Sequence, residues 1–372
     1  MTIFCLDNII NSKKIYGSED NSLKIITKME LEPGMILGED VIYQDRVLFK
    51  KGDTCTNMMI SQLKNYNVLC VTIMEDADFA VTHNEKLQFN QRFKNFKEKY
   101  DKCLTIYKGT MLSFIGTNRH IATATLIDIY NDIYSTIDNG SELLDFLYNL
   151  TSNDDELTYT QSLNAALLAG TFADWLKMNP EDKKILILCG FYYDIGKWNL
   201  PSEILWKPGK LTDDELRKVR SHPLLGYALV QRDPDLNEHV RNAVVMHHER
   251  FDGTGYPYKM TGNKIDIFAR YIAIVDTYIA MASPRTYRDA FTPLQILGNF
   301  EENLEKYDVE LLLPIMKNIA DSQIGTSVLL NDGTIWEVLM INQIKLSKPI
   351  LKNADNQFKD LMKVPEYIVR NV

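Results

Sequence analysis

The pattern that most constrains the fold of this chain is a helical hydrophobic rhythm between about residues 120 and 325. Apolar side chains recur there at intervals of three and four residues, which is the spacing of one face of an α-helix. Helix-breaking pairs, such as Asn139-Gly140 and Asn179-Pro180, separate the apolar segments and favour helix ends. Helices are predicted over residues 122–137, 141–150, 158–176, 180–195, 213–221, 223–230, 237–249, 268–282 and 293–307. Residues 119–325 are therefore predicted to form one all-helical domain.

The sequence before this region has a different texture. Residues 25–80 contain short runs rich in Val and Ile that are separated by turns, and the last run covers residues 68–74. Between the runs, a helix is predicted over residues 57–66, after the capping residue Thr56. This part is predicted to be a small α+β domain with a regulatory or interaction role, and residues 1–24 are treated as a polar leader.

A third texture occupies the C-terminal end, residues 326–372. Apolar and polar residues alternate there, which is typical of strands with one buried face. Asn331-Asp-Gly333 separates two such runs, at 328–330 and 335–340, and is a strong signal for a hairpin turn. We expect a β extension that closes on the helical domain.

Residues 81–118 are predicted to be a connector dominated by one long helix from about residue 85. Its aromatic and apolar residues are spaced close to a heptad seam, which usually packs on another helix. The seam positions are 89, 93, 96, 100, 103, 107, 111 and 114. Two interpretations follow: a homodimer contact through the helix at 85–118, or packing against the next domain of the same chain.

Composition limits the classes of function. The chain has 372 residues and a formal net charge of −9, with 41 Lys and Arg against 50 Asp and Glu. This balance disfavours a surface that tracks the phosphates of DNA or RNA, so no nucleic acid polymer is expected as a partner. The longest apolar run, residues 185–193, is too short to span a bilayer, and residues 1–14 lack the features of a signal peptide. The five cysteines form no CxxC pair, and we expect a cytoplasmic protein without membrane contact.

The segment most directly connected with function is residues 246–257, which reads Met-His-His-Glu-Arg-Phe-Asp-Gly-Thr-Gly-Tyr-Pro. Two adjacent imidazoles precede a turn with two glycines that carries no apolar rhythm, so core packing explains the segment poorly. We interpret it as a metal site at the end of a helix, with a substrate loop folded over it.

Five potential metal ligands stand near predicted helix ends: Asp194, His222, His247, His248 and Asp276. Imidazole and carboxylate donors without a thiolate suit iron, manganese or zinc in a hydrolytic centre. Lys197 follows Asp194 by about one helical turn, and its ammonium group is placed to hold a phosphate as a point charge. Asp194 and Lys197 are the residues that we expect to take part in catalysis.

The order of these residues resembles that of the HD-GYP domain phosphodiesterases, a branch of the HD superfamily that hydrolyses the bacterial second messenger cyclic di-GMP. The resemblance is close over about residues 155–288. It is carried by residues 192–201 (Tyr-Tyr-Asp-Ile-Gly-Lys-Trp-Asn-Leu-Pro), 207–212, 222–226 (His-Pro-Leu-Leu-Gly), 246–257, 269–276 and 285–288. It implies an all-helical HD-superfamily domain, a divalent metal cofactor and a cyclic dinucleotide ligand.

Two ligand positions of the family pattern carry other residues. The first histidine of the family would fall at Gln161, and the histidine of the His-Asp pair would fall at Tyr193, beside the retained Asp194. The glutamate that the family uses for a third metal would fall at Leu157. A neutral amide is a poor metal ligand, and a tyrosine must ionise from a pKa of about 10 to become one.

The resemblance also implies how these losses divide between two metal sites. In the family, one metal is held by the first histidine, the His-Asp pair and the distant aspartate, and this site retains only Asp194 and Asp276. The ligands retained at the neighbouring site are Asp194, His222, His247 and His248. We therefore predict at most one tightly held metal, either Fe, Mn or Zn. Because two metals normally clamp the nucleophile and the phosphate, losing one should lower the rate by orders of magnitude.

The positions that handle phosphate in the family are better retained. Lys197 resembles the family's phosphate-contacting lysine, and residues 252–257 resemble its substrate loop. Arg285 and Arg288 resemble its basic residues that face the ligand, and guanidinium groups pair bidentately with phosphate. The residues predicted to bind substrate are Lys197, Asp252, Gly253, Gly255, Tyr256, Pro257, Arg285 and Arg288.

Three functions are compatible with this pattern. We favour a degenerate HD-GYP protein that binds cyclic di-GMP, a related cyclic dinucleotide or a signalling protein partner, with little or no hydrolysis. The second is an active metal-dependent phosphodiesterase that releases pGpG or GMP through an atypical site, with one metal or a phenolate ligand. The third is an interaction module whose pocket is a relict.

Overall fold

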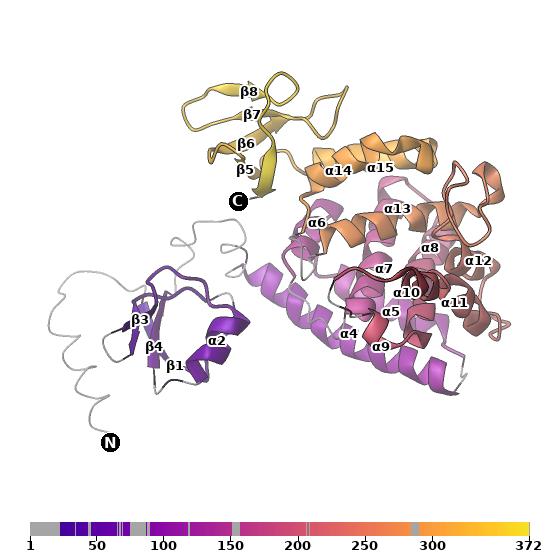
Figure 1. The fold of residues 1–372 in the computed structure, drawn as a ribbon, viewed down its shortest axis with the longest axis horizontal. Helices are drawn as coiled ribbons and strands as arrows, with labels where there is room; N and C mark the ends of the chain where they lie inside the picture. Colours follow the sequence, from indigo (N-terminus) through magenta and orange to yellow (C-terminus); the bar gives the residue numbers. More distant parts are fainter. Residues whose placement is uncertain are drawn as a thin grey trace. The chain divides into compact units, whose positions relative to one another are not determined.

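The computed structural model of the chain describes residues 23–33, 35–43, 46–64, 66, 68, 70–74, 87, 90–117, 120–150, 157–205, 207, 209–283 and 290–371. The chain divides into two compact units, Met1–Asn90 and Gln91–Val372 (Figure 1). The predicted leader at residues 1–24 lies almost entirely outside the described residues.

The N-terminal unit contains two small antiparallel sheets and one helix. Its elements are β1 (Leu23–Thr27), β2 (Val41–Tyr43), β3 (Arg46–Phe49), α2 (Asn57–Lys64) and β4 (Cys70–Met74). Strand β1 pairs with β4, and β2 pairs with β3. The Thr56 hydroxyl accepts a hydrogen bond from Met59 N at 3.2 Å, so it caps α2. The α+β character predicted for this part of the chain is confirmed.

The second unit is mainly helical, as predicted. Its helices are α4 (Gln91–Thr117), α5 (Thr123–Tyr134), α6 (Gly140–Tyr148), α7 (Leu157–Trp175), α8 (Pro180–Tyr192), α9 (Ser202–Leu205), α10 (Asp213–Val219), α11 (His222–Val230), α12 (Glu238–Met246), α13 (Ile267–Ala282), α14 (Pro293–Glu302) and α15 (Val309–Asp321), with 3₁₀ turns η3 (Ile195–Asn199), η4 (Gly262–Lys264) and η5 (Leu304–Lys306). Several predicted helices extend beyond the observed ends, most clearly α8 and α14, which end at Tyr192 and Glu302 and are followed by 3₁₀ turns. Helices α9 and α15 were not predicted individually.

Polar residues at the predicted boundaries begin the helices. The side chain of Asn139 accepts a hydrogen bond from Glu142 N at the start of α6, and that of Asn179 accepts one from Asp182 N at the start of α8. Each side chain satisfies a backbone N–H group that has no partner within the helix. The predicted breakers Asn139 and Asn179 therefore fix where these helices start.

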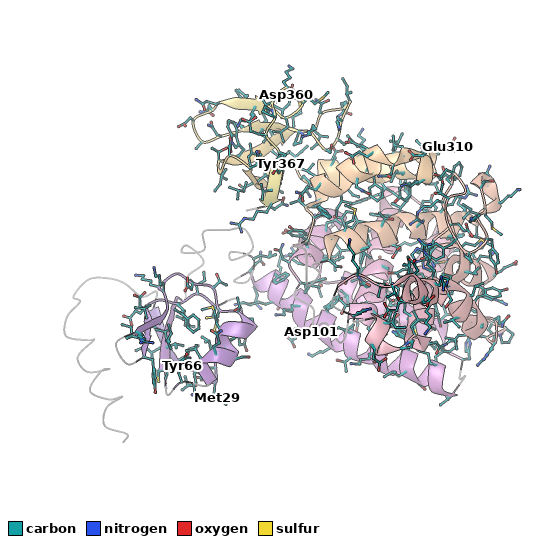
Figure 2. The ribbon with its side chains drawn as sticks, in the orientation of Figure 1. Met29, Tyr66, Asp101, Glu310, Asp360 and Tyr367 are labelled. Carbon is teal, nitrogen blue, oxygen red and sulfur yellow. The ribbon has the colours of Figure 1, made fainter. Side chains whose placement is uncertain are left out.

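Helix α4 buries its aromatic seam inside its own unit, against α5 and α7. The Tyr107 hydroxyl donates to Phe191 O at 2.6 Å, and the Tyr100 hydroxyl donates to Asn164 Oδ1 at 2.7 Å. The opposite face of α4 carries exposed charges such as Asp101 (Figure 2). The structure thus supports the intramolecular alternative over the homodimer contact, and seam position 89 lies outside the described residues.

Helices α7 and α8 pack closely in the centre of the helical domain and determine where the candidate site lies (Figure 1). A Cβ atom added to Gly190 on α8 would lie only 2.6 Å from the backbone nitrogen of Ala166 on α7. The absence of a side chain at Gly190 therefore lets the two backbones approach each other. Most of α7, and α8 from Ile185 onward, are buried on nearly all sides, as expected for helices in a core.

The C-terminal part forms a five-stranded antiparallel sheet in the order β8-β7-β6-β5-β9. The strands are β5 (Ser327–Leu330), β6 (Ile335–Met340), β7 (Ile350–Lys352), β8 (Phe358–Asp360) and β9 (Ile368–Asn371). The predicted hairpin between β5 and β6 is confirmed, with Gly333 at a φ of 81° in the turn. The Gln295 side chain donates to Ile368 O at 2.9 Å, so the sheet contacts α14.

Within the described ranges, every helix is too short or too polar to cross a lipid bilayer. The predicted cytoplasmic location stays a prediction.

Candidate metal centre

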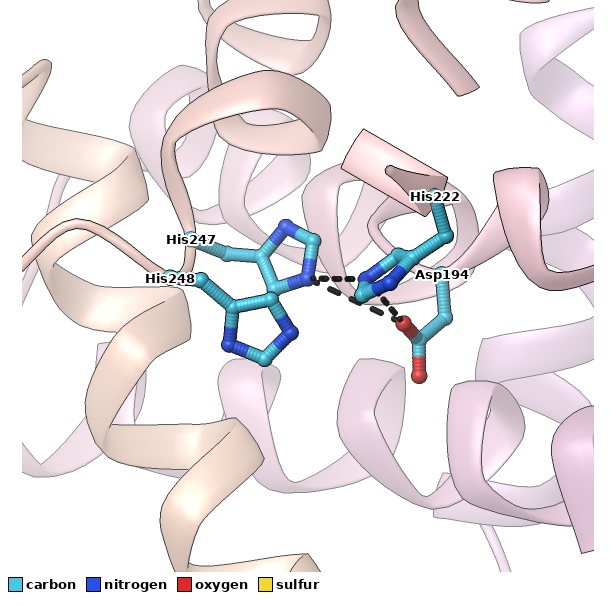
Figure 3. Close-up of side chains that lie close together, drawn as sticks. All are labelled: Asp194, His222, His247 and His248. Carbon is cyan, nitrogen blue, oxygen red and sulfur yellow. Dashed lines mark hydrogen bonds and ion pairs between the residues drawn. The ribbon is translucent and has the colours of Figure 1, made fainter. Parts of the chain in front are cut away.

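Four of the five predicted ligands converge in the interior of the helical domain (Figure 3). Each offers one donor atom, and these atoms all lie within 4.8 Å of one another. The four side chains are those of Asp194, His222, His247 and His248. Asp194 precedes η3, His222 begins α11, and the two adjacent histidines follow α12, so three separate segments contribute.

Two glycines bring the segments of Asp194 and His222 together. A Cβ atom at Gly196 would lie 1.9 Å from His222 O, and one at Gly226 would lie 2.8 Å from Val244 Cγ1 on α12. Turn η3 can therefore pack on α11, and α11 on α12, only because both positions lack a side chain. The spacing of Asp194 and His222 depends on this contact.

Replacing Gly196 by alanine is expected to destabilise the protein by roughly 3–5 kcal/mol, because the clash involves backbone atoms that cannot rotate away. The measurement is chemical denaturation followed by circular dichroism. Gly109→Ala on α4 is the matched control, since, apart from its chain neighbours and the nearby backbone of its own helix, no heavy atom of the described chain lies within 4 Å of its added Cβ. The control should leave stability unchanged or raise it slightly, because alanine favours helices. Equal stability of the two variants would contradict the packing argument.

The imidazoles of His222 and His247 are oriented by backbone carbonyls. His222 Nδ1 lies 2.7 Å from Val219 O, and His247 Nδ1 lies 3.0 Å from Val244 O. A carbonyl oxygen can only accept, so each Nδ1 donates, and in the neutral imidazole Nε2 then carries the lone pair. The two Nε2 atoms face each other at 3.2 Å, and Asp194 Oδ1 lies 3.3 Å and 3.7 Å from them.

This arrangement fits a cation. Two nitrogen lone pairs and a carboxylate oxygen repel one another unless a positive charge lies between them. Among the described residues, none donates a hydrogen bond to the buried Asp194 Oδ1, whereas Asp194 Oδ2 accepts one from Lys197 Nζ at 2.5 Å. A buried, unpaired oxygen beside imidazoles is the donor set expected of a divalent iron, manganese or zinc site.

Electrostatics keep these groups in the protonation states that metal binding needs. Burial, with the neighbouring His222, lowers the pKa of His247 to about 3, and burial with His247 lowers that of His248 well below its usual value. Burial alone would raise the pKa of Asp194, but the neighbouring positive charge of Lys197 holds it well below its usual range. Near neutral pH the imidazoles His247 and His248 are neutral and Asp194 is ionised.

Asp276, the fifth predicted ligand, stands beside this group on α13. Its Oδ2 lies 3.7 Å from His248 Nδ1, and its side chain is largely buried. Burial, together with the negative charge of Asp194, raises the pKa of Asp276. The structure places Asp276 next to the four converging donors, and its role as a ligand stays a prediction.

The loop after His248 folds back over the metal centre. A Cβ atom at Gly255 would lie 2.4 Å from Arg250 N, so only glycine permits this close return. Tyr256 N donates to His248 O at 3.1 Å, and the Tyr256 ring stacks on that of His248 with centroids 4.7 Å apart. Asp252 Oδ1 accepts hydrogen bonds from the backbone and hydroxyl of Thr254. The structure places this loop against His248, and its role as a substrate loop stays a prediction.

Glu249 fixes the far end of this loop. Its carboxylate is buried and accepts hydrogen bonds from Tyr258 N at 2.6 Å and Met260 N at 3.0 Å. The peptide bond between Tyr256 and Pro257 is cis. Glu249 therefore holds the loop backbone, although it directly follows the two histidines in sequence.

The two positions at which the family resemblance expects a histidine ligand are both buried. Gln161 lies on α7, and Tyr193, which ends α8, is almost completely buried. The Tyr193 ring packs edge-on against His247, with centroids 5.1 Å apart, and burial raises the pKa of its phenol well above the usual value. An uncharged aromatic side chain thus lies directly against one of the converging histidines. Arg285 and Arg288 lie outside the described residues, and Leu157 begins α7.

Two arginines near the centre were missed in the sequence. The Arg220 guanidinium lies over the Tyr256 ring, 5.5 Å from its centroid. Arg250 Nη1 donates to His247 O at 3.1 Å and to Glu249 O at 2.9 Å. Each stands two positions from a predicted histidine ligand, and this proximity is the one sequence signal that could have identified them.

The fold and the converging donors define an all-helical domain with a candidate metal centre of histidine and aspartate side chains. A family model described as HD domain matches residues 145–311. A cyclic di-GMP phosphodiesterase of Thermotoga maritima is 30% identical over 279 residues, which cover 73% of this chain and 74% of the relative. The chain therefore belongs to the HD-GYP branch of the HD domain family.

Two further relatives share shorter segments. A cyclic di-GMP phosphodiesterase of Pseudomonas aeruginosa is 31% identical over 232 residues, covering 62% of this chain and 56% of the relative. The 3'3'-cGAMP-specific phosphodiesterase 1 of Vibrio cholerae is 32% identical over 175 residues, covering 46% of this chain and 40% of the relative. The chain thus spans about half the length of these two relatives or less.

Proposed function

We propose that the chain binds a cyclic dinucleotide at the candidate metal centre and hydrolyses it slowly or not at all. Cyclic di-GMP is the ligand that we favour. The names of the relatives support a cyclic dinucleotide as the ligand. One observation supports the proposed loss of rate: where the family resemblance expects a histidine ligand, the uncharged Tyr193 ring packs against His247, one of the four converging donors.

The residues that would hold a metal are Asp194, His222, His247 and His248. When bound, a divalent metal supplies a nucleophilic water near neutral pH and polarises a phosphate oxygen. Lys197 holds Asp194 in place and adds a positive charge for a phosphate. Tyr256 covers His248 and excludes water from that face. With Gln161 and Tyr193 in the family's first ligand positions, we expect one metal rather than a two-metal clamp.

The alternative is an active phosphodiesterase that works through this atypical centre. It is favoured by the identity of 30% to a named cyclic di-GMP phosphodiesterase along 73% of the chain. Under this alternative, Asp194 and Lys197 would carry the same roles and only the second metal would be missing.

Incubation of metal-loaded protein with cyclic di-GMP, followed by chromatography for pGpG and GMP, tests the proposal together with calorimetry. We expect binding without appreciable product. Turnover that disappears in His247→Ala would establish the alternative function. If calorimetry detects no binding at high ligand concentration, the chain is an interaction module and a protein partner becomes the ligand to seek.

Metal content gives an independent check. We expect at most one equivalent of Fe, Mn or Zn per chain in freshly purified protein, because the four converging donors form a single group. Elemental analysis by plasma mass spectrometry measures the content, with His222→Ala as the variant that should lose it. Two or more equivalents that survive dialysis would contradict the prediction of one site.

A further inference from the structure

Arg220 lies at the outer edge of the metal centre. It follows α10 directly and stands two residues before His222. Its guanidinium lies over the Tyr256 ring at 5.5 Å, and that ring stacks on His248 at 4.7 Å with an angle of 24° between the planes. The side chains of Arg220, Tyr256 and His248 are thus stacked in this order, from the exposed Arg220 to one of the converging donors.

The N–H groups of Arg220 are free for a ligand. Its side chain is exposed, and in the described part of the chain no side chain or carbonyl accepts a hydrogen bond from its guanidinium. Two nearby cations are neutralised, because Arg217 pairs with Asp214 and Lys207 pairs with Glu215 at 2.7 Å. Arg220 is therefore an unneutralised positive charge held beside the centre.

Stacking on Tyr256 also determines what Arg220 can recognise. A guanidinium packed on an aromatic face keeps its planar edge of N–H donors free, and this edge matches two oxygens of a phosphate. The stacked ring reduces the rotational freedom that Arg220 would lose on binding, which favours a defined contact.

We propose that Arg220 binds a phosphate group of the cyclic dinucleotide at the metal centre, with Tyr256 as its platform. This inference rests on the proposed function. The phosphodiester is the anionic group of such a ligand. Because Arg220 is only two residues from His222, its guanidinium lies close to the converging donors and Lys197, which would bind the same phosphodiester.

The test is calorimetry with metal-loaded protein and cyclic di-GMP at several salt concentrations. Arg220→Ala should weaken binding about 10- to 100-fold and reduce its dependence on salt. Arg220→Lys keeps the charge but loses the planar fork, so it should recover only part of the affinity. Arg217→Ala, one helical turn away and already paired, is the matched control and should bind as the wild type does.

Three outcomes would overturn the inference while leaving the proposed function intact. Unchanged binding by Arg220→Ala, while the wild type binds, would exclude the contact. Weaker binding with an unchanged salt dependence would indicate a contact to the base rather than the phosphate. A parallel loss of bound metal would assign Arg220 to support of the centre itself. A wild type that binds no dinucleotide would instead refute the proposed function, and this inference with it.

Discussion

Replacing Gln161 and Tyr193 together by histidine is expected to add a second equivalent of bound metal and to accelerate cyclic di-GMP hydrolysis at least about 100-fold. The two substitutions restore the ligand types that the family resemblance assigns to these positions. Tyr193 directly precedes Asp194 in the sequence, and its ring centroid lies 5.1 Å from that of His247. An imidazole at position 193 would therefore lie next to the candidate metal centre. Metal analysis and chromatography of pGpG measure the two effects on the same preparation.

The single substitutions are the matched controls for this variant. Each restores one ligand, so neither Gln161→His nor Tyr193→His alone should reach the rate of the double variant. Adding His247→Ala to the double variant should return the rate to its starting level. If the double variant binds two metals and still releases no product, the altered ligands are not what limits hydrolysis, and the proposed degeneracy must lie elsewhere.

The helical domain was predictable because its apolar spacing is regular, but the ends of its elements were not. The 3₁₀ turn η3 continues the spacing of α8, so the sequence pattern runs through Tyr192 without a visible break. Helix α15 contains Pro314, which usually ends a helix, and only the packing of residues such as Leu312 and Ile315 in the core offsets this local disadvantage. Tertiary contacts, rather than local sequence, therefore determine where α8 ends and that α15 forms.

In the candidate site, too, some features could be predicted from the sequence and others depend on tertiary contacts. His247 and His248 could be identified from sequence because paired imidazoles before a glycine-rich turn have few structural explanations. The contact of Gly196 with the His222 carbonyl and the stacking of Arg220 on Tyr256 could not be identified, because each joins segments that are distant in sequence. Periodicity reports which face of an element is buried, but it does not report which residues meet across that face.

Asp194→Asn is expected to lose the bound metal, with a fall in metal affinity of roughly 100-fold or more. Asp194 supplies the one negative charge among the four converging donors, and its buried Oδ1 has no hydrogen-bond donor in the described part of the chain. An amide keeps the size of the side chain but offers a neutral oxygen. Three imidazoles and an amide then provide no charge to offset the dehydration of a divalent cation. Competition with a chelating indicator dye measures the affinity.

Asp266→Asn is the matched control for this change, because Asp266 is also a largely buried aspartate of the same domain. It caps α13 through Phe268 N, and asparagine caps helices about as well as aspartate, so the control should fold and keep its metal. Retention of metal by Asp194→Asn at wild-type affinity would place the cation away from this centre. A selective loss would instead make Asp194 the residue on which metal binding, and with it ligand binding, depends. His222 and His247 would then serve as neutral donors whose positions are set by the carbonyls of Val219 and Val244.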